Sequence, residues 1–399
     1  MFVWAIVCEY NPFHNGHQYQ IKKIRECGAT HIVAIMSGNF TQRGIPSIIS
    51  KHTKAEIALK NGCDLIIELP TPYCVANAEK FAYGAIFLAD ALNCIDFLSF
   101  GCENDNINDL QKLADISNSS DVISLAKEYL KNGISFSSAR CNAIETLFGK
   151  HFSKLISKPN NILAIEYIKN LKLLNSTIKP IPILRNGCQH NGNLIYENFA
   201  SSSILRNMIL KNNKDIKKFI PEKAYQILSK EFDNGFAPAN IFNCERAILS
   251  KLRCMSQNDF LQILDVSEGL ENKIYKSVQN SVSLNEIYSK IKSKRYTLLR
   301  IQRIILSAFL GITKDFFNYS PPYLKILGFN DRGKDILKIA KNKSTLPIVT
   351  NNSDIKKLNN NSSAIKFLEI ENHSYNLYNL MLPNIKPCGS ELTNQIIKI

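Results

Sequence analysis

The first two hundred residues alternate short apolar runs with longer segments in which apolar positions recur every three or four residues. Short apolar runs predict buried strands, and the longer spacing predicts helices. The expected strands are FVWAIVC (2–8), HIVAIMS (31–37), CDLIIELP (63–70), IDFLSFGCE (95–103) and KPIPILR (179–185). The expected helices between them are 14–27, 51–62, 77–93 and 161–175. Strands that are apolar throughout and alternate with helices indicate an α/β fold with a parallel sheet covered on both faces.

Beyond residue 211 the strand pattern fades and helical spacing dominates, most clearly in 237–255, 258–281, 283–311 and 333–342. Only LPIVTN (346–351) reads as extended. A chain of 399 residues exceeds the usual size of one domain. We therefore predict two domains, an α/β domain over 1–210 and a mainly helical, basic domain over 211–399. The segment KNNKDIKK (211–218) fits either a hinge or a helix end.

The net charge of +15 is unevenly distributed. Residues 1–150 hold 13 Lys and Arg against 15 Asp and Glu, whereas residues 211–399 hold 29 against 17. A lysine-rich genome would not spare the first 150 residues, so the asymmetry favours a polyanionic partner such as nucleic acid on the later part. The eleven cysteines form no CxxC pair, which favours a reduced, cytoplasmic protein. No apolar run is long enough for a membrane span. The first residues lack a basic region followed by a cleavable apolar segment, so we expect no secretory leader.

The segment EYNPFHNGHQYQIKK (9–23) directly follows the first predicted strand. In a sheet of this kind, ligands bind beyond the carboxyl ends of the strands, where a loop enters a helix. The helix N-terminus offers unpaired N–H groups that suit a phosphate, and Gly16 allows close approach of the backbone. His14 in the loop and His17 in the first turn are both placed to face one anion. A single histidine here would more often be structural, but two around a glycine predict phosphate chemistry.

NPFHNGH (11–17) resembles the HxGH signature of the nucleotidyltransferase superfamily, whose Rossmann-like domain is of the HUP type. In that superfamily the two histidines stabilise charge on the phosphates of ATP as pyrophosphate leaves. ASSSILR (200–206) is similar to the superfamily's ISSTxxR motif, in which serines and an arginine hold phosphates at a second helix N-terminus. Alone, such a serine run would indicate only a helix cap. Together the two motifs imply catalytic roles for His14 and His17 and phosphate contacts for Ser202, Ser203 and Arg206.

Seven segments follow one another between residue 3 and about residue 335: CEYNPFHNGH, MSGNFTQRGIPSI, GCDLIIELP, SFGCE, PNNILAIEY, FASSSILR and KSKRYTLLRIQR. In content and order they resemble the tRNA(Met) cytidine acetate ligase family. This resemblance implies that acetate is activated with ATP and Mg²⁺ as acetyl-adenylate. The acetyl group then passes to N4 of the wobble cytidine (C34) of elongator tRNA(Met), giving N4-acetylcytidine. Oligomeric state is not predicted.

The resemblance also implies a set of nucleotide contacts. Gly101 would let adenosine approach the sheet, although it fits a simple turn equally well. Either Asn160 or Asn161 would bind the nucleotide, or Asn160 would only cap its helix. The implied ATP-binding residues are Val7, Cys8, Glu9, Tyr10, Asn11, Pro12, Phe13, His14, Asn15, Gly16, His17, Gln20, Gly101, Asn160, Asn161, Arg185, Ser202, Ser203 and Arg206.

The loop SGNFTQRG (37–44) is expected beside the phosphates. Arg43 and Gln42 would contact tRNA or the acyl-adenylate, or Arg43 would cap a neighbouring helix. In SKHTKAE (50–56) the chain departs from the family, which has Asp in place of Ser50 and Arg in place of Lys54. Lys51 would contact the triphosphate or lie on a solvated helix face. No cluster of carboxylates is evident to hold a metal, so ATP itself would supply most ligands of Mg²⁺.

The basic stretch 292–303 is the expected tRNA platform, with Lys292, Lys294, Arg295, Arg300 and Arg303 along one helix and Tyr296 able to stack. A solvated basic face is the alternative. Two other functions share parts of this pattern: a small-molecule adenylyltransferase acting on a phosphorylated acceptor, and a non-catalytic RNA-binding protein with this fold. The basic helical extension argues against the first, and the intact histidines and Arg206 argue against the second.

Overall fold

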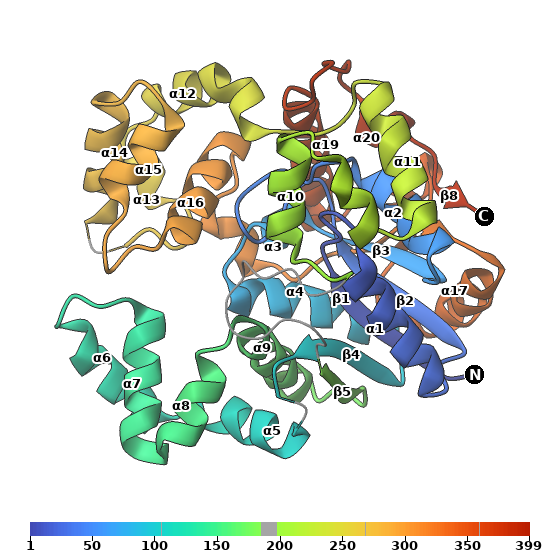
Figure 1. Ribbon diagram of the computed structural model, residues 1–399, viewed down its shortest axis with the longest axis horizontal. Helices are drawn as coiled ribbons and strands as arrows, with labels where there is room; N and C mark the ends of the chain where they lie inside the picture. The colour runs from blue at the N-terminus through green and yellow to red at the C-terminus, as the bar shows by residue number, and fades with distance from the viewer. Residues whose placement is uncertain (105, 185–197, 268, 359) are drawn as a thin grey trace.

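A single sheet organises the molecule. The computed structural model describes residues 1–104, 106–184, 198–267, 269–358 and 360–399 (Figure 1). The strands are β1 (Val3–Cys8), β2 (His31–Ser37), β3 (Leu65–Leu69), β4 (Phe97–Cys102), β5 (Lys179–Leu184), β6 (Leu324–Phe329), β7 (Ile348–Val349) and β8 (Ile397–Lys398). Their order across the sheet is β5-β4-β1-β2-β3-β6-β7, and β8 also pairs with β6.

The first five strands are parallel, and β1 lies between β2 and β4. The chain runs outward from β1 through β2 to β3, then returns to the other side of β1 as β4. This reversal makes a crevice at the carboxyl ends of β1 and β4, where open α/β sheets bind ligands. The predicted α/β class is therefore confirmed, and the predicted corner after β1 lies at the crevice.

Helices cover both faces of the sheet. Those up to residue 210 are α1 (Asn15–Glu26), α2 (Lys51–Lys60), α3 (Thr71–Cys74), α4 (Ala78–Ala91), α5 (Ile107–Ile116), α6 (Ser120–Leu130), α7 (Phe136–Phe148), α8 (Lys150–Ile156), α9 (Pro159–Leu173) and α10 (Ser202–Leu210). Side chains alternate along each strand, so Val33 and Ile35 face one core with α4 and α9. Ile32 and Ala34 face the other core, which α1, α2 and α10 complete.

The later helices are η1 (Lys214–Phe219), α11 (Glu222–Asp233), η2 (Ile241–Cys244), α12 (Glu245–Arg253), α13 (Gln257–Leu261), α14 (Leu270–Gln279), α15 (Leu284–Ile291), α16 (Leu298–Leu310), η3 (Lys314–Asn318), α17 (Asp331–Lys343), α18 (Asn352–Lys356), α19 (Ser362–Asn379) and α20 (Ser390–Thr393). Among them, α12 to α16 lie at the upper left of Figure 1, α11, α19 and α20 lie above the sheet, and α17 lies to its right. Buried residues of α12 to α16 belong to the same apolar core as α4 and α9.

Several details of the later region differ from the sequence analysis. The pattern 258–281 forms two helices, α13 and α14. The pattern 283–311 was expected to be one helix, but α15 ends at Ile291 and α16 begins at Leu298, where the Thr297 side chain accepts from the N–H of Arg300. The prediction also missed β6, which pairs antiparallel with β3. Its apolar residues are interrupted by Lys325 and Gly328, so the run lacks the continuous pattern of the earlier strands. The chain thus returns to the first sheet beyond residue 324.

Candidate active site

The histidine corner is a helix cap. After β1 the chain turns through Tyr10, whose φ of 48° lies in the left-handed region, and enters α1 with His14 as N-cap. The ring Nδ1 of His14 accepts a hydrogen bond from the N–H of Gly16 at 3.0 Å. A Cβ on residue 16 would lie 2.9 Å from Cε1 of this ring. Gly16 therefore leaves the space in which the His14 ring lies.

His17 completes the cap from inside the helix. Its Nδ1 accepts from the backbone N–H of His14 at 3.2 Å, and the two imidazoles stack with centroids 3.7 Å apart. An Nδ1 that accepts from an N–H carries no proton, so in this arrangement each ring is neutral and bears its hydrogen on Nε2. In this arrangement each histidine can offer an Nε2–H as a hydrogen-bond donor, without a full positive charge.

A second helix N-terminus meets the first. Ser201 caps α10, and Oγ of Ser202, the first residue of the helix, lies 3.1 Å from Nε2 of His14. With the tautomer above, His14 donates and Ser202 accepts. Two helix N-termini meet at one point, and the partial positive charge of each favours an anion there. The structure thus brings together His14, His17 and Ser202 across 188 residues of sequence.

Arg206 lies on the same helix and reaches back to the corner. Its Nη1 donates to the carbonyl of Asn11 at 2.8 Å, and its Nη2 donates to Oγ of Ser203 at 3.0 Å. Burial, with the nearby positive charge of Arg43 as a second cause, lowers the pKa of Arg206 to about 10. The guanidinium is still charged at neutral pH, and its surroundings favour a negatively charged ligand.

The other corner residues build the support. Asn11 is buried, and its Oδ1 accepts from the N–H of Ile48 at 2.9 Å. Asn15 donates through Nδ2 to the carbonyls of Asn198 and Lys218, which ties α1 to the segments around α10. Tyr10 and Phe13 are buried and pack against each other, and Tyr10 also packs edge-on against the His17 ring. Pro12 is buried, whereas Val7, Cys8, Glu9 and Gln20 are partly exposed.

Across the crevice, Gly101 lies within β4, paired with Ile183 of β5. The alternative that it serves a turn is therefore wrong. Phe97 packs on the α1–α10 core, so by alternation the bare face of Gly101 points to the same side of the sheet. Arg185, the remaining residue expected on this side, lies outside the described residues.

The two asparagines have different environments. Asn161 is fully buried; its Oδ1 accepts from the N–H of Glu103, and its Nδ2 donates to the carbonyl of Leu155. Asn160 is partly exposed and donates through Nδ2 to the Glu103 carboxylate at 2.6 Å. The alternative that Asn160 caps α9 is wrong, because Lys158 is the N-cap and the Glu103 carboxylate accepts from the N–H of Asn161 at 3.1 Å. Glu103 was missed, since nothing in the sequence links it to residue 161.

The loop 38–47 connects the corner to the basic helix α16. The N–H of Gln42 donates to the Glu9 carboxylate at 2.6 Å, and its carbonyl accepts from Nη1 of Arg303 at 3.4 Å. Gly44 has a φ of 71°, and a Cβ there would lie 2.4 Å from the backbone nitrogen of Arg303. The loop backbone therefore lies directly against α16. Arg43 is exposed next to this contact.

Two residues of α2 take roles that the sequence did not predict. Lys54 is buried and donates to the carbonyls of Glu9, Ser37 and Gly38 at 3.0, 2.7 and 2.7 Å, so it fastens together the ends of β1 and β2. Burial lowers its pKa to about 8. Lys51 is 1% exposed and ion-paired with Glu68 and Glu391. The alternative of a solvated face is wrong for Lys51, and these pairings give no support to a phosphate contact.

Ser50 is the N-cap of α2, with its side chain accepting from the N–H of Thr53. Serine and aspartate are equally good N-caps. The departure from the Asp of the family at this position therefore preserves the cap, with no need for a metal or ion-pair role.

The basic stretch 292–303 does not form one helical face. Lys292 and Lys294 are exposed in the connection between α15 and α16. Tyr296 is 8% exposed, so it has little surface on which a base could stack, and Arg295, Arg300 and Lys273 lie over its ring at 5.1 to 6.0 Å. Arg300 donates to the carbonyl of Asp265, and Arg303 lies 3.7 Å from its carboxylate. Arg300 and Arg303 are therefore partly occupied within the protein.

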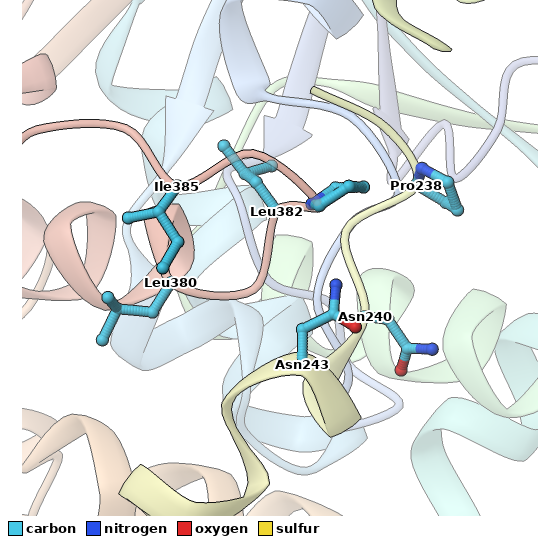
Figure 2. Close-up of a pocket in the computed structure, with 7 residues that line it drawn as sticks. Pro238, Asn240, Asn243, Leu380, Leu382 and Ile385 are labelled. Carbon is cyan, nitrogen blue, oxygen red and sulfur yellow. The ribbon is translucent and has the colours of Figure 1, made fainter. Parts of the chain in front are cut away.

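Two cavities lie away from the corner. One, of about 420 Å³, is lined by apolar residues and asparagines of the segments 238–243 and 380–385 (Figure 2). Another, of about 380 Å³, lies around Arg25 and Asp64, beside the first residues of α17. In the described residues no three His, Cys, Asp or Glu side chains are grouped to hold a metal ion. Among the helices that the structure describes, none has the length and apolar character that crossing a bilayer requires.

The fold and the corner define a nucleotidyltransferase of the HIGH class, and the HIGH Nucleotidyl Transferase family profile matches residues 1–391. The tRNA(Met) cytidine acetate ligase of Thermoanaerobacter sp. (strain X514) is 38% identical over the whole of both chains. That of Clostridium botulinum (strain Okra / Type B1) is 40% identical over 97% of this chain and 96% of its own. The chain belongs to the tRNA(Met) cytidine acetate ligase family, as the sequence analysis expected.

Solved structures agree with this assignment. The crystal structure of Thermotoga maritima TmcAL in its apo form I has a TM-score of 0.94 and 31% identity, with 100% of both chains covered. The form bound with alpha-thio ATP has a TM-score of 0.92 at the same identity and coverage.

Proposed function

We propose that this chain is an ATP-dependent ligase that acetylates N4 of the wobble cytidine of elongator tRNA(Met), in the cytoplasm. In the first step an acetate oxygen attacks the α-phosphorus of ATP, forming acetyl-AMP and releasing pyrophosphate. In the second, N4 of the cytidine attacks the acetyl carbon, AMP leaves, and N4 loses a proton. The observation that carries the proposal is the meeting of two helix N-termini at His14 and Ser202, within a chain related to these ligases over its full length.

The corner suits the first step because negative charge moves onto pyrophosphate as the α-phosphorus bond breaks. The Nε2–H donors of His14 and His17, the hydroxyls of Ser202 and Ser203 and the guanidinium of Arg206 would hold these oxygens. Such fixed donors stabilise developing charge without reorganising during the reaction. A planar guanidinium can also bind two phosphate oxygens at once.

The nucleoside end would lie along the crevice, over the bare face of Gly101. Asn160, which is partly exposed on the same side as Glu103, is the better candidate of the two asparagines for a nucleotide contact. The other nucleotide contacts that the family resemblance implies, including Arg185 and residues 7–13, stay part of the proposal. The corner offers hydrogen-bond donors rather than metal ligands, so Mg²⁺ would be held by phosphate oxygens of ATP. The ion would neutralise part of the triphosphate charge.

For the second step the wobble base must leave its stack to reach the acyl carbon. Arg43 is exposed where the loop 38–47 lies on α16, so it is placed to contact either the RNA or the adenylate. Lys292 and Lys294 are the exposed cations of the proposed tRNA platform, with Arg295, Arg300 and Arg303 behind them. Phosphate contacts of this kind position the RNA without reading its sequence.

The test is incubation with ATP, Mg²⁺, acetate and unmodified elongator tRNA(Met), followed by mass spectrometry of the digested nucleosides. We expect an acetyl mass on the anticodon cytidine with the wild type. His17→Ala should lose it while retaining tRNA affinity. Wild-type protein that gives no acetylcytidine under conditions in which a Thermoanaerobacter relative does would refute the proposal.

The tRNA platform has a separate test. Replacing Lys292 and Arg295 by alanine should weaken tRNA binding and reduce its dependence on salt concentration, because fewer counterions are released. Acetate-dependent exchange between ATP and pyrophosphate without tRNA should be unchanged in this variant. Unaltered tRNA affinity and salt dependence would place the platform elsewhere.

A further inference from the structure

A cluster of buried charges lies between the second helix, the sheet and the C-terminal segment. Its members come from five elements and are Lys51 (α2), Glu68 (β3), Lys325 (β6), Glu371 (α19) and Glu391 (α20). The side chains of Lys51, Glu68 and Glu391 are no more than 2% exposed. The proposed reaction uses none of them, so the cluster requires another explanation.

Lys51 is the centre of the cluster. Its Nζ lies 2.7 Å from Oε1 of Glu68 and 2.6 Å from Oε2 of Glu391. Lys325 adds a second cation, 3.8 Å from Oε2 of Glu68 and paired with the Glu391 carboxylate. Glu391 therefore bridges two lysines, and it ties α20 to both α2 and β6.

The same cluster lies against the loop 38–47. A Cβ on Gly38 would lie 2.5 Å from Oε1 of Glu68, so this carboxylate packs directly on the loop backbone. The N–H of Lys51 donates to Oδ1 of Asn39 at 2.8 Å. Nearby, the Tyr378 hydroxyl of α19 donates to the carbonyl of Ser47 at 3.0 Å. The loop 38–47 is thus contacted at one end by Glu68 and Lys51, which pair with the C-terminal Glu391, and at the other end by Tyr378 of α19.

Buried ion pairs add little to stability, because removing both charges from water offsets most of their attraction. They do fix geometry, since each member can pair only where its partner lies. Here the fixed part is the loop whose Gln42 N–H holds the Glu9 carboxylate and whose Arg43 lies near Arg206.

We infer that Glu391 is a positioning residue for adenylate formation. By holding Lys51 it keeps Glu68 against Gly38, and so sets the position of the loop 38–47 relative to the histidine corner. This inference rests on the proposed function, because it concerns the ATP-dependent first step. It assigns a part in that step to a segment that lies outside both nucleotidyltransferase motifs.

The test compares Glu391→Gln with Glu369→Gln, which removes an exposed carboxylate from α19. Acetate-dependent exchange between ATP and pyrophosphate is measured over a range of ATP concentrations. We expect Glu391→Gln to raise KM for ATP about tenfold or more, since small misplacement of a catalytic loop is costly. Glu369→Gln should behave as the wild type. Affinity for tRNA should be unchanged in both.

A second variant separates an effect on the position of the loop 38–47 from an effect on the stability of the protein. Lys325→Met combined with Glu391→Gln removes one charge of each sign, so the melting temperature should recover relative to Glu391→Gln while KM stays raised. Recovery of KM together with stability would overturn the inference, as would a wild-type KM in a folded Glu391→Gln. Absence of exchange in the wild type would instead refute the proposed function.

Discussion

Positive charge is buried at two places that both contact the loop 38–47. At the histidine corner, Arg206 lies beside Arg43 and two helix N-termini, and burial with the Arg43 charge lowers the pKa of Arg206. In the cluster around Lys51, burial alone would lower the pKa of this lysine, but the charges of Glu68 and Glu371 outweigh it and raise the pKa.

The difference separates a binding site from a scaffold. A cluster whose cations face carboxylates has its charges satisfied within the protein and holds elements together. A corner with excess positive potential and donors at two helix ends is stabilised when an anion arrives. The two regions share one loop, so the scaffold is in a position to set the geometry of the site.

We expect the largest effect from Arg206→Ala, which removes the buried cation of the histidine corner. Loss of its charge should lower the rate of acetate-dependent ATP–pyrophosphate exchange by about 10²- to 10³-fold, as for other preorganised donors. Because the buried cation is removed from a positive region, the melting temperature should change little. Arg246→Ala, at an exposed arginine of α12, is the matched control and should leave exchange unchanged. Equal exchange rates in Arg206→Ala and Arg246→Ala would contradict the proposed role of the histidine corner in adenylate formation.

Gly44→Ala separates the loop from α16. The added Cβ meets the Arg303 backbone in addition to the strain of a positive φ. Gly133 has a nearly identical φ of 72° with nothing near its missing Cβ, so Gly133→Ala isolates the strain, worth about 1 kcal/mol. We expect Gly44→Ala to lower the free energy of unfolding by at least about 2 kcal/mol more, and to reduce tRNA acetylation. Urea titrations measure the free energy of unfolding of both variants. Equal losses in Gly44→Ala and Gly133→Ala would show that the contact between residue 44 and the Arg303 backbone is loose.

Glu371→Gln tests the cluster of buried charges around Lys51. Burial, reinforced by the charge of Glu68, raises the pKa of Glu371 to about 7. The folded state then binds a proton that the unfolded state has released, so this group's contribution to stability is full below about pH 4.5 and falls until about pH 7. As the pH rises from 5 to 7.5, the free energy of unfolding of Glu371→Gln should increase relative to that of the wild type by on the order of 2 kcal/mol. The measurement is chemical unfolding of both proteins at several pH values. Free energies of unfolding that change with pH by the same amount in the two proteins would contradict this prediction.

The groups around Glu371 define the range of that experiment. They are Lys51, Glu68, Cys74, Tyr323 and Lys325. Burial and the Lys51 charge lower the pKa of Lys325 to about 8, so measurements above pH 7.5 would report on both groups.

The smallest expected effect is at Ser50. Ser50→Asp should change the free energy of unfolding by only a few tenths of a kcal/mol, because aspartate also caps α2, whereas Ser50→Ala should cost about 1 kcal/mol. Exchange activity should be unaffected by Ser50→Asp. A large gain of activity with aspartate would revive a charge-dependent role for this position.

Local pattern was sufficient to predict the five parallel strands and the histidine corner, whereas the pairing of this corner with the serine–arginine motif came from the resemblance to the nucleotidyltransferase superfamily. These features depend on short segments whose chemistry is visible in sequence. Glu103, Lys54 and Glu391 were not predictable, because their partners lie 58, 45 and 340 residues away. Tyr296 was misjudged for the same reason: its burial depends on packing that the basic stretch itself does not encode.

The antiparallel pair of β3 and β6 has a consequence for any attempt to isolate residues 1–210. All five residues of β3 are buried, and the hydrogen bonds along its outer side are made by β6. A fragment ending near residue 210 would leave this apolar strand as an open edge, the kind of surface on which chains aggregate. Such a fragment should precipitate when expressed alone and become soluble when residues 324–329 are supplied on the same chain.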